Sequence, residues 1–185
     1  MRHSLLRGAL ACLLLTPVLG GCVLPPSGAA SPPTVEVIPA DARALVYGRS
    51  AREVLEDPQL RDKVRALFGA DWGPPTPGGA GKLTLAAPQY FELGGPLRMV
   101  RIGAANYIAI TGCAPQACAG RRGLLLIREG GEELMARLDD GGFSHHHAYG
   151  PGVVGGPGGA GVVLESTLRA LERASGGTAF PRPAP

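Results

Sequence analysis

The sequence lacks an N-terminal apolar run long enough to cross a bilayer. Its apolar stretch, from Ala9 to Leu19, is shorter than the roughly 20 residues that a membrane-spanning helix needs. Arg2 and Arg7 precede this stretch and small residues follow it, which is the layout of a secretory signal peptide. We therefore expect residues 1–21 to be a cleaved leader and the rest of the chain to be exported.

The residues Leu19-Gly20-Gly21-Cys22 resemble the lipobox of bacterial lipoproteins. This resemblance implies cleavage before Cys22 and acylation of that cysteine; the alternative is an ordinary signal peptide with a coincidental cysteine. Val23, rather than Asp, follows the cysteine, which in bacteria with two membranes implies sorting to the outer one. The expected location is the cell envelope, as an outer-membrane lipoprotein that faces the periplasm and contacts the membrane through its lipid anchor.

The mature sequence also lacks an excess of either charge. Removal of Arg2 and Arg7 with the leader reduces the 18 Lys and Arg residues to 16, against 15 Asp and Glu residues. A surface that binds nucleic acid, or a polybasic patch that binds membranes, requires an excess of basic residues. We therefore expect no nucleic-acid partner.

Cysteine is scarce, with four residues in the whole chain. Cys12 is removed with the leader and Cys22 carries the lipid, so Cys113 and Cys118 are the only thiols that remain. An exported protein lies in an oxidising compartment, where such thiols pair. The sequence therefore predicts a Cys113–Cys118 disulfide.

Glycine and proline are abundant, with 29 and 18 residues, but they cluster in a few segments. Residues 22–34 carry the lipidated cysteine and have the composition of a flexible tether. Residues 73–79 and 150–161 are typical of internal loops, and 177–185 of a disordered tail. The remaining segment, 35–176, is long enough for one modest domain.

Hydrophobic periodicity predicts an α+β fold with a central antiparallel sheet and flanking helices. One helix is expected to begin at Asp57, which can cap it, and to end at Gly69; its buried stripe comprises Leu60, Val64, Leu67 and Phe68. A second helix is expected to bury Leu168 and Leu171 with Thr167 or Ala174. The expected helices are 58–68, 165–175 and, on a weaker pattern, 50–57, and the expected strands are 97–103, 106–111, 122–129 and 132–140.

A ring closed by Cys113 and Cys118 contains only six residues, so its loop-entropy contribution is about 2 kcal/mol. Bonded cysteines bring their Cα atoms within about 4.4–6.8 Å, so the chain must reverse inside the ring. Pro115 suits the first central position of a turn and places Gln116 at its tip. We expect a stiff loop that protrudes from the end of the sheet and loses little ordering entropy when it enters a partner's cleft.

The passage 99–129 resembles the inhibitor of vertebrate lysozyme (Ivy) family. At this place the family has a hairpin strand with an aromatic residue, then Cys-x-Pro-x-x-Cys-Gly and a long apolar strand. The resemblance implies an α+β fold, often dimeric, whose disulfide loop enters the active cleft of a c-type lysozyme. The matching residues are Gly103, Tyr107, Cys113, Pro115, Cys118 and Arg122.

The chain departs from the family at the loop tip. There the family has His and Asp after the loop proline, whereas this chain has Gln116 and Ala117, and Ala119 replaces a Gly. We still expect a protein without catalysis or cofactor that inhibits c-type lysozyme or a lytic transglycosylase, with a homodimer as a further implication of the resemblance. The alternative is a structural or interaction lipoprotein that has lost lysozyme inhibition. The expected target-binding residues are Cys113, Ala114, Pro115, Gln116, Ala117 and Cys118.

Two clusters of polar residues remain. In an extended segment His145 and His147 would share a face and could bind a metal with a third ligand. No carboxylate or cysteine lies beside them at ligand spacing, so we expect an exposed loop around His145–His147 and no metal. Five carboxylates around the preceding hairpin are expected to be solvated: Glu129, Glu132, Glu133, Asp139 and Asp140.

Overall fold

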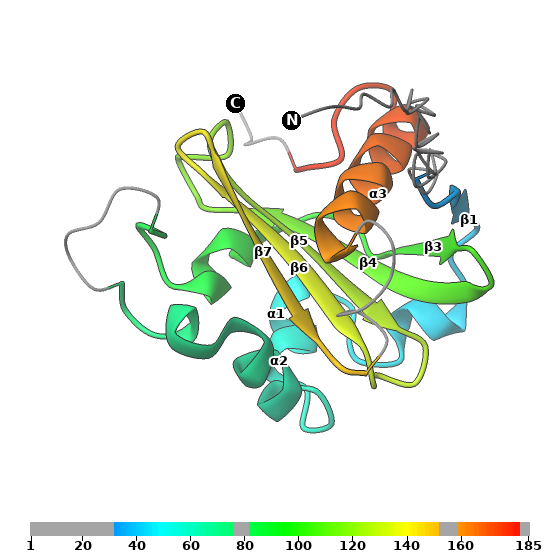
Figure 1. Ribbon diagram of the computed structural model, residues 1–185, viewed down its shortest axis with the longest axis horizontal. Helices are drawn as coiled ribbons and strands as arrows, with labels where there is room; N and C mark the ends of the chain where they lie inside the picture. The colour runs from blue at the N-terminus through cyan, green and yellow to red at the C-terminus, as the bar shows by residue number, and fades with distance from the viewer. Residues whose placement is uncertain (1–31, 76–81, 152–158, 182–185) are drawn as a thin grey trace, which may run out of the picture.

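The computed structural model describes residues 32–75, 82–151 and 159–181, and its centre is one antiparallel sheet of seven strands (Figure 1). The strand order is β1-β3-β4-β5-β6-β7, and the short β2 pairs with the end of β4. The expected α+β fold with a central antiparallel sheet is confirmed. The strands are β1 (Val35–Ile38), β2 (Leu93–Gly94), β3 (Arg98–Ile102), β4 (Ala105–Cys113), β5 (Arg121–Arg128), β6 (Leu134–Asp140) and β7 (Phe143–Tyr149).

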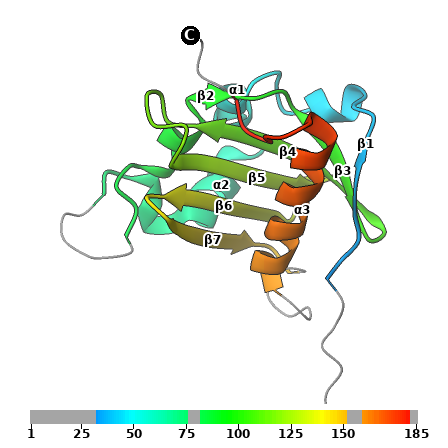
Figure 2. The ribbon, with the colours of Figure 1, turned by 90° about the horizontal axis from the view of Figure 1, so that it is seen from above.

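Helices cover both faces of this sheet (Figure 2). The long helix α3 (Gly159–Ser175) lies across one face. The opposite face is covered by α1 (Ala51–Glu56) and α2 (Arg61–Phe68) together with three short 3-10 helices. These are η1 (Ala42–Leu45), η2 (Gly69–Trp72) and η3 (Ala87–Phe91).

The apolar run of β5 lies at the centre of the sheet, where both of its faces are buried. Leu124 and Leu126 pack on the α3 side, and Leu125 and Ile127 pack on the side of α1 and α2. Alternate strand residues point to opposite faces, so a strand covered on both sides is apolar throughout. This explains why a continuous run, rather than an alternating one, forms a strand here.

The segment after Asp57 forms the helix that its apolar spacing predicts, although α2 begins only at Arg61. The Asp57 side chain accepts a hydrogen bond from the backbone N–H of Gln59 at 2.8 Å, and a turn links it to the helix. Gly69 ends the helix with a φ of 53°, a positive value that glycine adopts easily because it has no Cβ. The expected stripe of Leu60, Val64, Leu67 and Phe68 is buried.

Helix α3 begins at Gly159, inside the segment expected to be a loop, and the ordered chain continues past its end. Thr167 is buried, whereas Ala174 is exposed. The expected disordered tail from residue 177 is wrong for its first part, because Ala179 and Phe180 are each only 6% exposed and pack on the α3 face of the sheet. The buried phenyl ring of Phe180 holds this segment against the domain.

The histidine run lies in edge strand β7, and the expectation of an exposed loop is wrong. This strand pairs with β6, with Ala136 opposite His147 and Leu138 opposite His145. Both histidines are partly buried and share the face that packs toward α2, whereas His146 faces α3 beside Gly161. Polar residues are tolerated here because an edge strand is only partly enclosed.

No helix within residues 32–75, 82–151 and 159–181 is long and apolar enough to cross a membrane. The expected leader 1–21, the expected acylation site Cys22 and most of the expected tether 22–34 lie outside the described residues.

Candidate functional site

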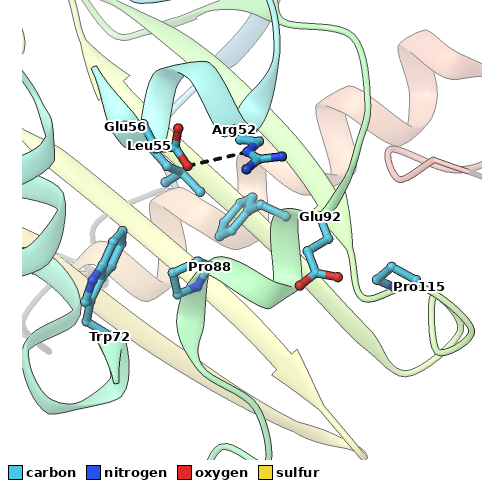
Figure 3. A pocket seen from close by; sticks show the side chains of 8 residues that line it. Arg52, Leu55, Glu56, Trp72, Pro88, Glu92 and Pro115 are labelled. Carbon is cyan, nitrogen blue, oxygen red and sulfur yellow. Dashed lines mark hydrogen bonds and ion pairs between the residues drawn. The ribbon is translucent and has the colours of Figure 1, made fainter. Parts of the chain in front are cut away.

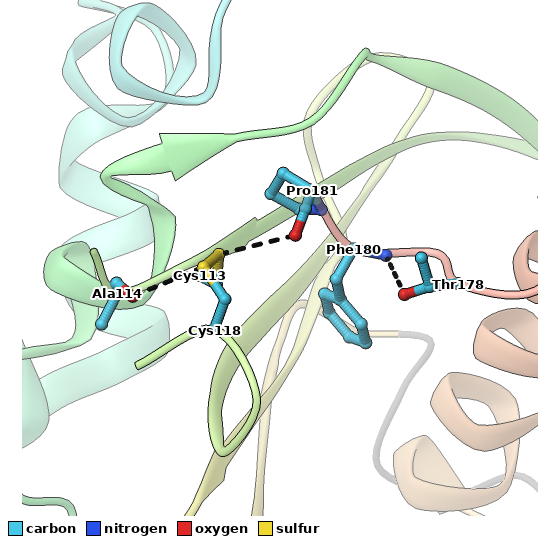
Figure 4. The surroundings of a disulfide bond; sticks show 6 residues. All are labelled: Cys113, Ala114, Cys118, Thr178, Phe180 and Pro181. Atoms are coloured by element: carbon cyan, nitrogen blue, oxygen red, sulfur yellow. Dashed lines mark hydrogen bonds between the residues drawn. A yellow bond between two sulfur atoms is a disulfide. The ribbon is translucent and has the colours of Figure 1, made fainter. Parts of the chain in front are cut away.

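The candidate site is the loop between β4 and β5, which a disulfide between Cys113 and Cys118 closes into a ring (Figure 4). The Cα atoms of the two cysteines are 4.9 Å apart. Within the ring, the N–H of Ala117 donates to the carbonyl of Ala114 at 3.1 Å, which confirms the expected turn. Pro115 occupies its first central position, and Gln116 follows with a φ of 64°. These are the features of a type II turn.

Gln116 is the only residue other than glycine with a positive φ in the described part of the chain. Such a conformation strains most L side chains and is least costly for Gly, Asn, Asp and His. The ring and the turn hydrogen bond together hold the residue in it. The tip therefore presents Gln116 in one fixed backbone conformation.

The ring projects from the sheet at its tip and is buried at its base. Cys113 is fully buried and Ala114 is 3% exposed, whereas Pro115 and Gln116 are exposed. The base is anchored because the N–H of Ala114 donates to the carbonyl of Arg121 at 3.0 Å, which extends the β4–β5 pairing by one step. A partner can therefore reach the side chains of Pro115 and Gln116 without any rearrangement of the ring.

The two arginines at the start of β5, Arg121 and Arg122, form ion pairs with two aspartates of the neighbouring strand β6. Arg121 lies opposite Asp140 and Arg122 opposite Asp139. Arg121 Nε is 3.1 Å from Asp140 Oδ1, and Arg122 Nη2 is 3.0 Å from Asp139 Oδ2. The strand that leaves the ring is thus fixed to its neighbour by charged groups as well as by backbone hydrogen bonds.

The five carboxylates around the β5–β6 hairpin were expected to be solvated, but three of them are buried. Asp139, Asp140 and Glu133 are 7%, 5% and 6% exposed. Glu133 accepts from the Tyr107 hydroxyl at 2.9 Å and pairs with Arg128 at 3.0 Å. Buried charge is tolerated where several donors satisfy it. The signal that sequence reasoning missed was the Arg-Arg and Asp-Asp dipeptides, which a hairpin places opposite each other.

Asp140 has the most donors of these carboxylates. Its Oδ2 accepts from the Tyr90 hydroxyl at 2.6 Å and from the N–H and hydroxyl of Thr84 at 2.5 and 2.6 Å. Burial by itself raises the pKa of Asp140, but the hydrogen bonds from Thr84, Tyr90 and Arg121 outweigh it and lower the pKa to about 2. Asp140 is therefore a carboxylate in the folded protein at neutral pH, and it ties η3 to the β6 end of the sheet.

Asp139 forms a second charged cluster beside the first. It accepts from Arg137 Nε at 2.7 Å and from the Ser144 hydroxyl at 2.7 Å, in addition to Arg122. Arg137 also pairs with Glu165 of α3. Burial raises the pKa of Asp139, and the Arg137 and Ser144 hydrogen bonds reverse that effect and leave the pKa below its usual value. This cluster connects the ring's exit strand to α3.

The C-terminal segment covers the base of the ring on the α3 side (Figure 4). The Phe180 ring lies 4.5 Å from the guanidinium carbon of Arg122, a cation–π distance. The carbonyl oxygen of Pro181 lies 3.9 Å from Cys113 Sγ. A disulfide sulfur carries no hydrogen, so this is a packing contact. Sequence reasoning missed this contact because Cys113 and Pro181 lie 68 positions apart in the chain.

A groove runs beside the ring on the opposite side (Figure 3). It has a volume of about 520 Å³ and is bounded by α1, η2, η3 and the ring. Trp72 lies toward one end of the groove and Pro115 toward the other. The Trp72 indole stacks on Phe68 at a centroid distance of 6.2 Å, packs against the core and also lines this groove. The tip of the ring and the groove therefore form one continuous surface.

The histidine pair on β7 does not line this groove. The His147 ring meets Phe68 edge-on at 5.1 Å, and its Nε2 is 3.8 Å from Asp71 Oδ2. Burial lowers the pKa of His147, although Asp71 partly opposes this. Among the residues that the structure describes, no group of three or more His, Cys, Asp or Glu side chains is arranged to hold a metal ion.

A scan against protein-family models, a search of curated proteins and a search of solved structures each find no match to this chain.

Proposed function

We propose that this protein is a lipid-anchored envelope protein that binds and inhibits a c-type lysozyme or a lytic transglycosylase. In this proposal Cys22 carries the lipid, and the tip of the ring, Pro115 and Gln116, enters the enzyme's active cleft. The observation that carries the proposal is the exposed tip on a buried, disulfide-closed base. A loop already held in one conformation loses little ordering entropy on binding.

Gln116 has the hydrogen-bonding groups that such a cleft requires. A glycosidase of this class presents one protonated carboxyl and one carboxylate. The amide of Gln116 can donate to the carboxylate and accept from the protonated acid. It cannot become a cation, and hydrogen bonds between neutral groups contribute about 0.5–1.5 kcal/mol, against about 1.5–3 kcal/mol where one group is charged. We therefore expect inhibition about tenfold weaker than a histidine in the same position would give.

The positive φ of Gln116 makes substitutions at this position informative. Gly, His and Asp all tolerate this region better than Gln does, so Gln116→Gly, Gln116→His and Gln116→Asp should keep the turn. Differences among these variants then report on the side chain and not on the fold. Circular dichroism and a thiol assay on each oxidised variant check that the fold and the disulfide are intact.

The test is the rate of peptidoglycan hydrolysis by a c-type lysozyme and by a lytic transglycosylase at increasing concentrations of the protein. Gln116→His should strengthen inhibition of lysozyme about tenfold. Gln116→Gly should weaken it because the tip loses its polar group, and Gln116→Asp should abolish it because two carboxylates would meet. If the wild-type protein with its disulfide intact inhibits neither enzyme, the proposal is refuted and a structural or interaction role remains.

A further inference from the structure

The groove beside the ring has a floor and a rim of different chemistry. Leu55, Pro88 and Phe91 form an apolar floor, with Leu55 and Phe91 only 5% and 1% exposed. Charged side chains from α1 and from the end of η3 stand around it (Figure 3). An elongated apolar floor with a polar rim suits a side chain that has an aliphatic stem and a charged head, because the stem can be buried while the head stays at the rim.

The charges at the rim favour a cation. Glu56 is paired with Arg52 at 3.4 Å, and both side chains are largely exposed. Glu92 is exposed and makes no ion pair with any residue in the described ranges. Among the side chains that line the groove, the two carboxylates of Glu56 and Glu92 are thus matched by the single cation of Arg52, and Glu92 lies near the Pro115 end (Figure 3).

The aromatic end of the groove already has a cation beside it. The guanidinium carbon of Arg65 already lies 5.9 Å from the centroid of the Trp72 ring. Indole is the aromatic group that attracts cations most strongly. Because Arg65 already supplies a cation at Trp72, the charged head of an incoming side chain is expected at the other end of the groove, beside Glu92, with its stem on the apolar floor.

We propose that this groove receives a lysine or arginine side chain of the enzyme whose cleft receives the ring. The identity of that partner rests on the function proposed above. Pro115 belongs to both surfaces, so a protein that encloses the tip also lies over the groove. The groove supplies a second contact, and the carboxylate of Glu92 selects partners with a basic residue beside their cleft.

The first test compares Glu92→Gln with Glu132→Gln. Glu132 is exposed in the β5–β6 turn, at the opposite end of the sheet from the ring, so the control removes the same charge far from the groove. Exposed ion pairs contribute little, and Glu92→Gln should weaken binding to lysozyme about two- to fivefold. Raising the salt concentration should reduce this difference, because salt screens exposed charges. Glu132→Gln should leave affinity unchanged. Equal affinities for the two variants would overturn the proposal.

The second test does not depend on the enzyme. Nα-acetyl-arginine amide is titrated into the purified, isotope-labelled protein, with Nα-acetyl-citrulline amide as its neutral counterpart and chitotriose as a sugar probe. The proposal expects saturable shifts of the Trp72 indole N–H with the arginine compound, weaker in Glu92→Gln and absent with citrulline. Equal shifts with citrulline, no saturable shift with arginine, or shifts with chitotriose alone would overturn it.

The two tests separate the two proposals. If the arginine compound occupies the groove but the protein inhibits neither enzyme, the groove is shown to bind a basic side chain and the proposed function is refuted. If the protein inhibits lysozyme and Glu92→Gln behaves as Glu132→Gln does, the proposed function is supported and the proposed role of the groove is refuted.

Discussion

Replacing Asp140 with Asn removes the charge on which the hydrogen bonds of Tyr90, Thr84 and Arg121 converge. These donors lower the pKa of Asp140 from 3.8 to about 2 in the folded protein. At about 1.36 kcal/mol per pKa unit, the charged form contributes about 2 kcal/mol to the free energy of unfolding. Because the folded pKa is the lower one, this contribution is complete above the unfolded pKa and is lost as the pH falls from about 5 to about 2.

The assay is urea denaturation of the wild-type protein and of Asp140→Asn at pH 7 and at several lower pH values. The free energies of unfolding should differ by about 2 kcal/mol at pH 7, and the difference should close as the pH approaches 2. Some pH dependence should remain in the variant, because the pKa of Asp139 is also lowered. Glu132→Gln serves as the exposed control, with an effect within about 0.5 kcal/mol. A difference that stays constant from neutral to acid pH would refute the reasoning.

Two further predictions concern the packing around the ring. Gly112→Ala should destabilise the protein by about 2 kcal/mol in urea denaturation, because a Cβ there would lie 2.6 Å from the Cα of Phe91. Gly120→Ala is the control and should be neutral, because no atom lies within 4 Å of its Cβ. Equal effects of the two substitutions would contradict the close packing at Gly112. Phe180→Ala should cost about 3 kcal/mol and speed reduction of the disulfide by dithiothreitol, because Cys113 is buried under this segment. An unchanged reduction rate would show that the segment does not shield the bridge.

The elements that could be predicted from the sequence are those whose pattern is local. In α2 the apolar residues recur with the helical period, and in β5 they form one continuous run. Each of these patterns lies within a single segment of the sequence. Strand β7 was missed because an edge strand has no such pattern: its three histidines carry little β-propensity, and only pairing with β6 makes them a strand. Strand β1, with four residues, and strand β2, with two, are too short to show a period.

The features of the candidate site also divide into local ones, which could be predicted from the sequence, and non-local ones, which could not. The disulfide and the turn span six residues, so the cysteines and Pro115 were sufficient to predict them. Arg121 and Arg122 form ion pairs with residues of the neighbouring strand β6. These pairs can be predicted only once the register of β5 against β6 is known. The groove and the packing of Phe180 bring together segments that are far apart in the chain, which no local pattern encodes.

These non-local contacts set the direction in which the ring points, which its disulfide does not. Closing a ring of six residues contributes about 2 kcal/mol, mainly through the unfolded chain. In the folded state the bridge fixes only the two ends of the loop, whereas the direction of the tip depends on the strands that enter and leave it. Arg121, Arg122 and Phe180 fix the exit strand through two ion pairs and one cation–π contact. A chain that kept both cysteines but lost these contacts would keep the ring, but the direction of its tip would no longer be fixed. A Cys-x-Pro-x-x-Cys pattern by itself is therefore weak evidence for a binding tip.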